Sequence, residues 1–417
     1  MSVKERFLRY VAIDTQSQDN AGCYPSTEKQ KNLLRLLVKE LKEMGLKDAA
    51  MDEWGYVTAT IEASAQAEKD APVIGLISHV DTAPDMSGAN VRPRELLYEG
   101  GDIPLNGDVT MKLADFPFLE RFKGKHLIVT DGTTLLGGDD KAGVAEIMSL
   151  AEKLTSDASI VHPRIRIAFT PDEEVGCGTD HFDVAAFGAD YAYTVDGGML
   201  GELEYENFNA AAADITVNGC NIHPGSAKNK MVNSMLILQE LNSMLPPAEI
   251  PACTEGYEGF YHLNEMSGSV EKTQAHYIIR DHDRERFEMR KQRMEKICRY
   301  LNDKYGEGTV VADIRDSYYN MKEKILPHMH LINNAVKAMQ ACGVTPEITP
   351  IRGGTDGARL SFEGLPCPNI CTGTANMHGK FEFVCTEDMQ KITDILCCLV
   401  SLYAKSRKAN LPGVRIF

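Results

Sequence analysis

The hydrophobic positions of the chain change period repeatedly, from the spacing of a helix to the short apolar runs of buried strands. Helical spacing predicts helices over residues 5–17, 27–45, 141–154, 330–341 and 387–407. Alternating or continuous apolar runs predict strands over residues 56–62, 72–80, 165–170, 191–195, 345–351 and 368–372. Strands that alternate with helices in this way are typical of an α/β domain with a mostly parallel sheet.

A different order of elements appears after about residue 208. Predicted strands and helices follow one another as β-α-β-β-α-β, which is the order of a ferredoxin-like unit. We therefore predict a discontinuous α/β domain, residues 1–208 and 321–417, with an α+β domain inserted over residues 209–320. Residues 82–130 are rich in Pro, Gly and Asp, and we expect them to be irregular.

Composition narrows the functional classes. The net charge of −16 argues against binding to nucleic acid or to anionic membranes. No apolar stretch reaches the roughly 18 residues that a membrane span needs, and the charged start of the chain is unlike a signal peptide. Eleven cysteines without a C-x-x-C pair indicate buried thiols in a reducing compartment, so we expect a cytoplasmic protein.

Side chains that can bind a metal gather where predicted strands end. In open α/β sheets, ligands bind outside the carboxyl ends of the strands. Taken singly, most of these clusters are more often structural, for instance an N-cap aspartate; for the three acidic residues 172–174, a solvated acidic loop is an equally good alternative. The clusters are Ser78-His79-Val80-Asp81, Gly138-Asp139-Asp140, Asp172-Glu173-Glu174, Asp196-Gly197-Gly198 and His378-Gly379-Lys380.

Taken together, the clusters supply imidazole and carboxylate without thiolate. This is the ligand chemistry of a hydrolytic zinc, manganese or cobalt site. Two such ions about 3.5–4 Å apart can activate a water and polarise a carbonyl group. Adjacent glutamates at 173 and 174 also allow one to bind metal while the other acts as a general base.

Longer stretches around these clusters resemble the M20 metallopeptidase family. The resemblance implies a zinc-peptidase-like catalytic domain and an inserted lid domain, and it covers the chain nearly end to end. The stretches that carry it are Ser78–Thr82, Gly138–Gly143, Phe169–Gly176, Tyr193–Gly198, Thr254–Tyr261, His276–Asp281 and Ile351–Gly357.

The resemblance assigns a role to each cluster. It implies that His79 and Asp196 hold one metal, that Glu174 and His378 hold the other, and that Asp139 bridges the two. It also implies that Glu173 is the general base and that Asp81 orients His79. In this family the peptide bond after the bridging aspartate is cis, so we expect a cis bond between Asp139 and Asp140. Phe381 stands where we would expect a second histidine, outside the ligand set.

Two residues of the inserted domain are expected to contact substrate. His223 resembles a lid-domain histidine placed near the scissile carbonyl, and Arg280 resembles an arginine that binds a substrate carboxylate. An ion pair with Asp281 or Asp283 is the alternative for Arg280.

The expected activity is that of a dinuclear metal aminopeptidase that releases the N-terminal residue of tripeptides, with two zinc, cobalt or manganese ions as cofactors. Another M20-type amide hydrolase (a dipeptidase, carboxypeptidase or N-acyl-amino-acid deacylase) is the first alternative. An inactive, metal-stabilised binding protein is the second. Short peptides are the expected partners, and the oligomeric state stays open, with a homodimer through the inserted domain as one option.

Overall fold

The computed structural model describes residues 1–407, which form two compact units. The first unit consists of Met1–Tyr205, Met321–Thr349 and the chain from Thr355 onward. The second consists of Glu206–Asn320 and the short segment Pro350–Gly354. Nothing in the periodicity of the sequence indicates that Pro350–Gly354 belongs to the second unit.

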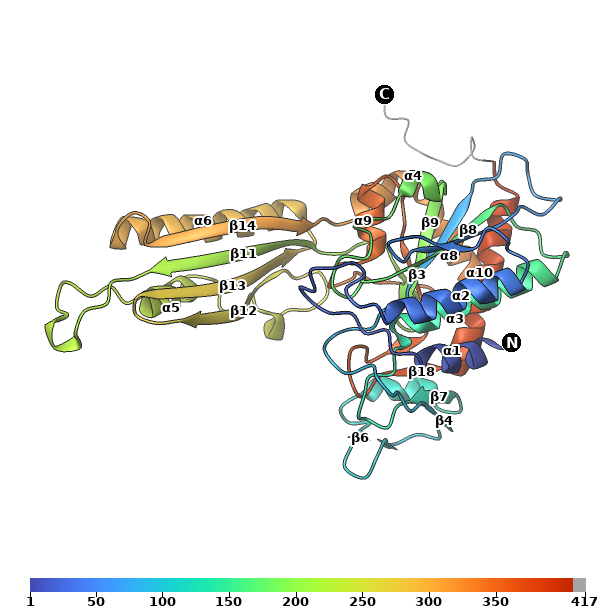
Figure 1. The fold of residues 1–417 in the computed structure, drawn as a ribbon, viewed down its shortest axis with the longest axis horizontal. Coiled ribbons are helices and arrows are strands. Elements are labelled where there is room, and N and C mark those ends of the chain that lie inside the picture. Colours follow the sequence, from blue (N-terminus) through green and yellow to red (C-terminus); the bar gives the residue numbers. More distant parts are fainter. Residues whose placement is uncertain (408–417) are drawn as a thin grey trace. The chain divides into compact units, whose positions relative to one another are not determined.

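The first unit is built on an eight-stranded mixed sheet (Figure 1). Its strands lie in the order β1-β2-β8-β3-β9-β16-β10-β15, and the central pairs β8–β3, β3–β9 and β9–β16 are parallel. This agrees with the predicted mostly parallel sheet. The strands are β1 (Ala50–Met51), β2 (Val57–Ile61), β3 (Ile74–His79), β8 (Ile165–Thr170), β9 (Tyr191–Gly197), β10 (Glu202–Glu204), β15 (Glu347–Ile348) and β16 (Asn369–Cys371).

Helices pack on both faces of this sheet, so every residue of its central strand β3 is buried. Helix α3 contacts β3 and β9, α1 and α10 pack on α3, and α8 packs on α10. On the other face, Ile77 and Ala168 share an apolar cluster with Phe187 and Leu360. None of the helices within residues 1–407 has both the length and the apolar composition to span a membrane. The helices are α1 (Val3–Val11), α2 (Gln30–Glu43), α3 (Gly138–Ser156), α4 (Val184–Phe187), α7 (Lys322–Ile325), α8 (His330–Ala341), α9 (Asp356–Phe362) and α10 (Thr386–Ala404), with the short 3₁₀ helix η4 (Leu326–His328).

The expectation that residues 82–130 are irregular is wrong. They contribute two strands to a four-stranded sheet of order β17-β18-β7-β4, and they also form a two-stranded sheet and a 3₁₀ helix. The partners β17 and β18 come from more than 200 residues away along the chain, so local periodicity could not reveal the pairing. The elements are β4 (Arg94–Leu97), β5 (Ile103–Pro104), β6 (Thr110–Met111), η1 (Pro117–Phe122), β7 (His126–Val129), β17 (Thr374–Ala375) and β18 (Phe383–Cys385).

Helix α2 begins later than its sequence signal suggests. Thr27 and Gln30 have the spacing of a capping box, but no such box forms; the helix starts at Gln30 and has no side-chain cap. The Gln30 amide instead donates to Asp172 Oδ1 at 2.6 Å. The capping box of this unit lies at α1, where Ser2 and Glu5 accept from each other's backbone N–H.

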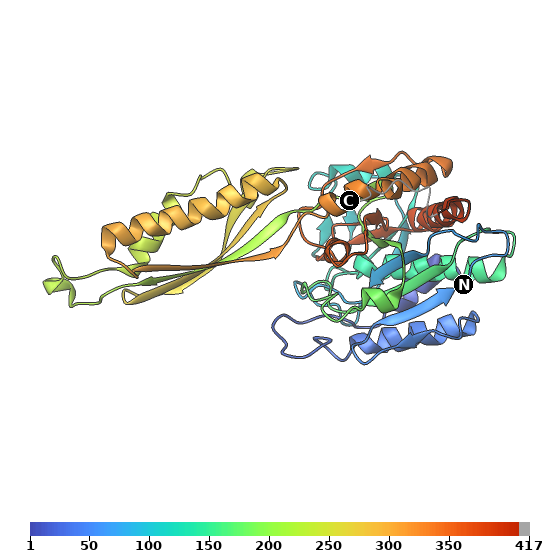
Figure 2. The same cartoon turned by 90° about the horizontal axis from the view of Figure 1, so that it is seen from above.

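The second unit has the predicted ferredoxin-like topology. Its antiparallel sheet has the order β12-β13-β11-β14, and α5 and α6 pack together on it, α6 lying along the sheet in Figure 2. Alternate residues of β11, among them Ala213, Ile215 and Val217, are buried in the apolar cluster of this unit. The elements are β11 (Asn209–Asn218), η2 (Pro224–Ser226), α5 (Ser234–Ser243), η3 (Pro251–Cys253), β12 (Phe260–Gly268), β13 (Lys272–Asp281), α6 (Arg284–Tyr305) and β14 (Val310–Tyr318).

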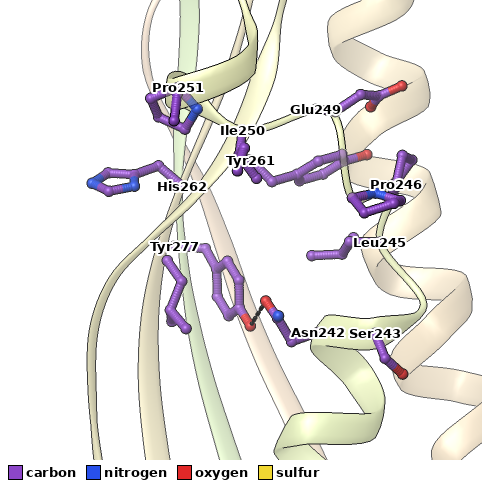
Figure 3. Close-up of a pocket in the computed structure, with 13 residues that line it drawn as sticks. Asn242, Ser243, Leu245, Pro246, Glu249, Ile250, Pro251, Tyr261, His262 and Tyr277 are labelled. Carbon is purple, nitrogen blue, oxygen red and sulfur yellow. Dashed lines mark hydrogen bonds between the residues drawn. The ribbon is translucent and has the colours of Figure 1, made fainter.

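The second unit contains a cavity of about 510 Å³ (Figure 3). Tyr261, Tyr277 and Leu245 point into it, together with the prolines that follow α5. The Tyr277 hydroxyl donates to Asn242 Oδ1 at 3.1 Å. None of the site residues predicted from the sequence lines this cavity, so its size does not mark the expected chemistry.

A buried histidine fixes the start of α8 in the first unit. His330 is 5% exposed, its ring meets Tyr191 edge-on at 4.5 Å, and its Nδ1 lies 3.3 Å from the Tyr403 hydroxyl. Burial, with a smaller contribution from the nearby His328, lowers the pKa of His330 to about 4. Between about pH 4 and pH 6.5 the His330 imidazole is therefore neutral in the folded protein, whereas in the unfolded chain it is protonated.

Because His330 is buried in its neutral form, we expect the folded protein to lose stability in mild acid. Below pH about 6.5 the unfolded state binds a proton that the folded state does not, until the pH falls to about 4. The free energy of unfolding should fall by about 3 kcal/mol from this group between pH 7 and pH 4. Urea unfolding of wild type and His330→Gln across this range tests it, because the variant should lose less stability by that amount. Parallel pH profiles would show that His330 does not contribute.

Candidate metal centre

Three neighbouring parallel strands bring the predicted ligands to one edge of the main sheet. His79 is the last residue of β3, Glu173 and Glu174 follow β8, and Asp196 lies near the end of β9. Because β8, β3 and β9 are adjacent and parallel, their carboxyl ends meet at the same edge. This is why residues more than 100 positions apart in the sequence share one site.

Asp139 lies between two groups of ligands and points one carboxylate oxygen at each. Its Oδ1 is 3.0 Å from His79 Nε2, and its Oδ2 is 3.3 Å from His378 Nε2. His79 Nε2 is also 3.3 Å from Asp196 Oδ1, and His378 Nε2 is 3.0 Å from Glu174 Oε2. Each imidazole thus pairs with its own carboxylate, and both share Asp139.

The donor atoms fit divalent cations. The ligand atoms of His79, Asp139 and Glu174 lie within 4.8 Å of one another, as do those of His79, Asp140 and Asp196. Imidazole nitrogens and carboxylate oxygens are the donors that zinc, manganese and cobalt accept. Glu174 Oε1 is buried and has no hydrogen-bond partner, which a bound cation would remedy.

The neighbouring Asp140 makes different contacts. Its Oδ2 accepts from the Ser78 hydroxyl and, at 3.2 Å, from the His79 backbone N–H. Asp140 therefore holds the end of β3, whereas Asp139 faces the imidazole ring nitrogens. The peptide bond between Asp139 and Asp140 is cis, as the resemblance implied.

Asp81 has two structural roles, of which only the first was expected. Its Oδ1 is 3.3 Å from His79 Nδ1, so it contacts the ring nitrogen opposite the one that faces Asp139. Its two oxygens also accept from the backbone N–H groups of Glu173 at 3.0 Å and Glu174 at 3.2 Å. One fully buried carboxylate therefore positions both an imidazole and the acidic turn after β8.

The crowding of carboxylates shifts the pKa values of the imidazoles upward. Burial lowers the pKa of His79, but Asp196 and Asp139 raise it by a larger amount, so the net value lies well above its usual range. Contacts with Asp139 and Glu174 raise the pKa of His378 to about 11. The neighbouring carboxylates thus favour a positive charge on both imidazole rings. The same negative charge would stabilise a bound cation.

The pKa of Asp139 shifts in the opposite direction from those of the neighbouring carboxyls. Burial raises the pKa of Glu174 to about 8 and that of Asp196 to about 6. Burial also raises the pKa of Glu173 well above its usual range, with Asp196 adding to the effect. Burial acts in the same direction on Asp139, but contacts with His378 and His79 outweigh it and lower the pKa of that carboxyl.

The chain is similar over nearly its whole length to proteins named peptidase T. It is 55% identical over 404 residues to the peptidase T of Alkaliphilus oremlandii, covering 96% of this chain and 99% of that protein. It is 54% identical over 407 residues to the peptidase T of Clostridium novyi, covering 97% and 100%. The chain belongs to the peptidase T family of M20 peptidases. Within it, residues 205–309 match the family model described as a peptidase dimerisation domain.

Solved structures agree with the fold of this family. The aminopeptidase PepT from Bacillus cereus aligns with a TM-score of 0.75 at 21% identity, covering 97% of this chain and 98% of that one. A dinuclear metal-binding M20 peptidase from Bacillus subtilis aligns with a TM-score of 0.65 at 13% identity, covering 96% and 98%. At these identities the likeness concerns the fold.

The two substrate contacts predicted from the family resemblance lie in the second unit. His223 is exposed, and its Nδ1 accepts from the Gly225 N–H at 3.2 Å. Arg280 donates to the Arg352 carbonyl at 3.0 Å, and its Nε has no partner. The alternative for Arg280 was an ion pair with Asp281 or Asp283, and the described structure does not show it. Asp281 pairs instead with Arg290 at 2.7 Å. The residues predicted as metal ligands and as the base all belong to the first unit.

One structural residue of this family site was missed by sequence reasoning. In the sequence Asp172 is the first of three consecutive acidic residues after β8; in the structure it adopts a positive φ of 60° and is 1% exposed. Its oxygens accept from the Ser26 N–H at 2.5 Å and from Gln30. It therefore ties the acidic turn to the start of α2. Phe381, the departure from the family pattern, packs edge-on against Phe116 at 5.4 Å.

Proposed function

We propose that the chain is a dinuclear metal-dependent aminopeptidase that releases the N-terminal residue of tripeptides. The observation that carries the proposal is the position of Asp139, whose two oxygens face two separate imidazole–carboxylate pairs. A single-metal site or a purely structural acid has no need of this arrangement. The peptidase T relatives, and a Staphylococcus aureus structure described as a tripeptidase, support the substrate class.

In this proposal His79 and Asp196 hold one ion, Glu174 and His378 hold the other, and Asp139 bridges them. Two divalent ions, when bound, supply the Lewis acidity that activates a water and polarises the scissile carbonyl. Zinc is our choice, with cobalt and manganese as substitutes, because the donors are imidazole and carboxylate without thiolate.

Glu173 is proposed as the general base. Its backbone N–H donates to Asp81 beside that of Glu174. Burial, together with the nearby Asp196, raises the pKa of its carboxyl, which suits a group that takes up a proton. It accepts a proton from the attacking water and delivers it to the leaving amine.

The substrate class separates this proposal from its rivals. With zinc present, a tripeptide of three different residues should release its first residue and leave a dipeptide. The N-acetylated form should be cleaved at least 100-fold more slowly, because an aminopeptidase recognises the free amine. Chromatography of the products checks both. Release of the last residue would indicate a carboxypeptidase, hydrolysis of N-acyl amino acids a deacylase, and no turnover a binding protein.

Substitutions of Glu173 and Glu174 should have different effects on turnover and on metal binding. Glu173→Gln should keep both ions and lose kcat by about 10³-fold or more, because the proton acceptor is gone. Glu174→Gln should bind one ion more weakly, because an amide is a poorer ligand than a carboxylate. Metal content by mass spectrometry, together with steady-state kinetics, separates the two. Near-normal turnover by Glu173→Gln would rule out its role as base.

We further propose that Arg280 binds the substrate carboxylate and that His223 lies near the scissile carbonyl. Arg280 already presents a buried Nε without a partner, and its planar guanidinium matches a carboxylate. His223 lies in an exposed turn with a free Nε2 in the described structure.

Removal of the Arg280 guanidinium should affect only substrates with a free C-terminal carboxylate. Arg280→Ala should lower kcat/KM for a tripeptide by roughly 100-fold, as expected for losing a charge-assisted pair. The corresponding tripeptide amide should change by less than about threefold. Arg280→Lys is the matched control: it keeps the charge and should recover part of the loss. Equal losses on peptide and amide would remove Arg280 from this role.

The proposal includes a homodimer as the oligomeric state and the cytoplasm as the cellular location. The match of residues 205–309 to a dimerisation domain supports a homodimer formed through the second unit, which exposes Leu236, Met266 and Met289. All eleven cysteines are free thiols, which supports a reducing compartment such as the cytoplasm.

A further inference from the structure

A buried glutamate outside the proposed ligand set contacts the turn that carries Asp139. Glu382 is 1% exposed. Its Oε2 accepts from the backbone N–H groups of Leu136 at 2.7 Å and Gly137 at 2.8 Å, and its Oε1 accepts from that of Asp139 at 3.0 Å. The side chain therefore binds the backbone of this turn at three points and uses both oxygens to do so.

The turn can approach Glu382 only because it contains glycines. A Cβ on Gly138 would lie 2.7 Å from methyl groups of both Thr374 and Val384, and 3.1 Å from Glu382 Oε1. Gly137 has a positive φ of 82°, which side chains rarely allow. The glycines before Asp139 thus allow the backbone to pack against the β17–β18 hairpin, where Glu382 accepts its hydrogen bonds.

Glu382 also belongs to the segment that carries the other end of the site. It follows His378 by four residues and immediately precedes β18, whose first residue Phe383 is fully buried. Strand β18 pairs with both β17 and β7, so Glu382 is attached directly to a strand that is paired on both sides. One carboxylate thereby connects the turn of Asp139 to the strand that follows the loop of His378.

We propose that Glu382 is the positioning residue that aims the two oxygens of the bridging Asp139. The proposal rests on the two-metal site proposed above. The carboxylate holds the backbone N–H of Asp139 itself, so a change at Glu382 reaches the bridge through a single residue. Its effect should therefore appear in metal affinity and in kcat, and much less in KM.

Three backbone donors on two oxygens require a carboxylate. In Glu382→Gln only one oxygen remains as an acceptor, and the amide NH₂ would face a backbone N–H. At least one buried donor would then lose its partner. Glu382→Asp keeps both oxygens but is one methylene shorter, so it should restore part of the arrangement.

Cobalt titration of the metal-free full-length protein tests this directly. At pH 8, visible absorption should report two Co²⁺ ions bound to wild type. Glu382→Gln should bind the weaker ion 10–100-fold less tightly, as is typical when a group supporting a metal ligand is removed. Its kcat should fall by a similar factor with KM within about threefold, and Glu382→Asp should lie between the two proteins.

Glu40 supplies a matched control in the same unit. It is also a buried carboxylate with three donors, from Arg6 at 2.8 Å, Arg9 at 2.6 Å and Tyr10 at 2.6 Å, but none of them belongs to the site. Glu40→Gln should lower the free energy of unfolding measured in urea and leave both Co²⁺ affinities unchanged.

The outcomes separate this inference from the proposed function. Wild-type Co²⁺ affinities in Glu382→Gln would overturn the positioning role while leaving the two-metal site intact. An equal loss of affinity in Glu40→Gln would show that general destabilisation is the cause, and would also overturn it. If wild type itself binds fewer than two ions, the proposed function fails. Should Glu382→Gln not fold, Glu382→Asp decides: weakened Co²⁺ binding supports the role and unchanged binding overturns it.

Discussion

The concentration of carboxylates at one edge of the main sheet is the constraint on which the site depends. Parallel strands deliver Glu173, Glu174 and Asp196 to the same place, and like charges at such distances repel strongly when buried. The pKa values of the site reflect this crowding. Burial raises the pKa of Glu174 to about 8, and the acidic neighbours of His378 raise the pKa of its imidazole to about 11. Divalent cations, held by these residues, would neutralise the same charge.

Other buried carboxylates accept hydrogen bonds from the backbone around the proposed ligands. Asp81 holds the turn of Glu173 and Glu174, Asp140 holds the end of β3, and Glu382 holds the turn before α3. Each accepts from main-chain N–H groups, so each fixes the path of a segment that ends in a proposed ligand. The site therefore has an inner set of acids facing the ligand space and an outer set that orients the first through the backbone.

Part of this could be predicted from the sequence. The βαβ alternation, the ferredoxin-like order and the clusters at strand ends follow from local patterns, because buried strands and amphipathic helices leave clear periodicities. The contacts of Asp172 and Glu382 could not be predicted, since their partners Gln30 and Leu136 lie 142 and 246 residues away along the chain. Strands within residues 82–130 were missed for the same reason. The short β4 and β7 pair with each other or with β18, and no local signal marks them.

The central claim is that Asp139 bridges two cations, and anomalous diffraction from crystals of the zinc-loaded protein tests it most directly. The account predicts two anomalous peaks about 3.5–4 Å apart, one beside His79 and Asp196 and the other beside Glu174 and His378, with Asp139 contacting both. A single peak, or two peaks joined by Asp140 while Asp139 points away, would contradict it.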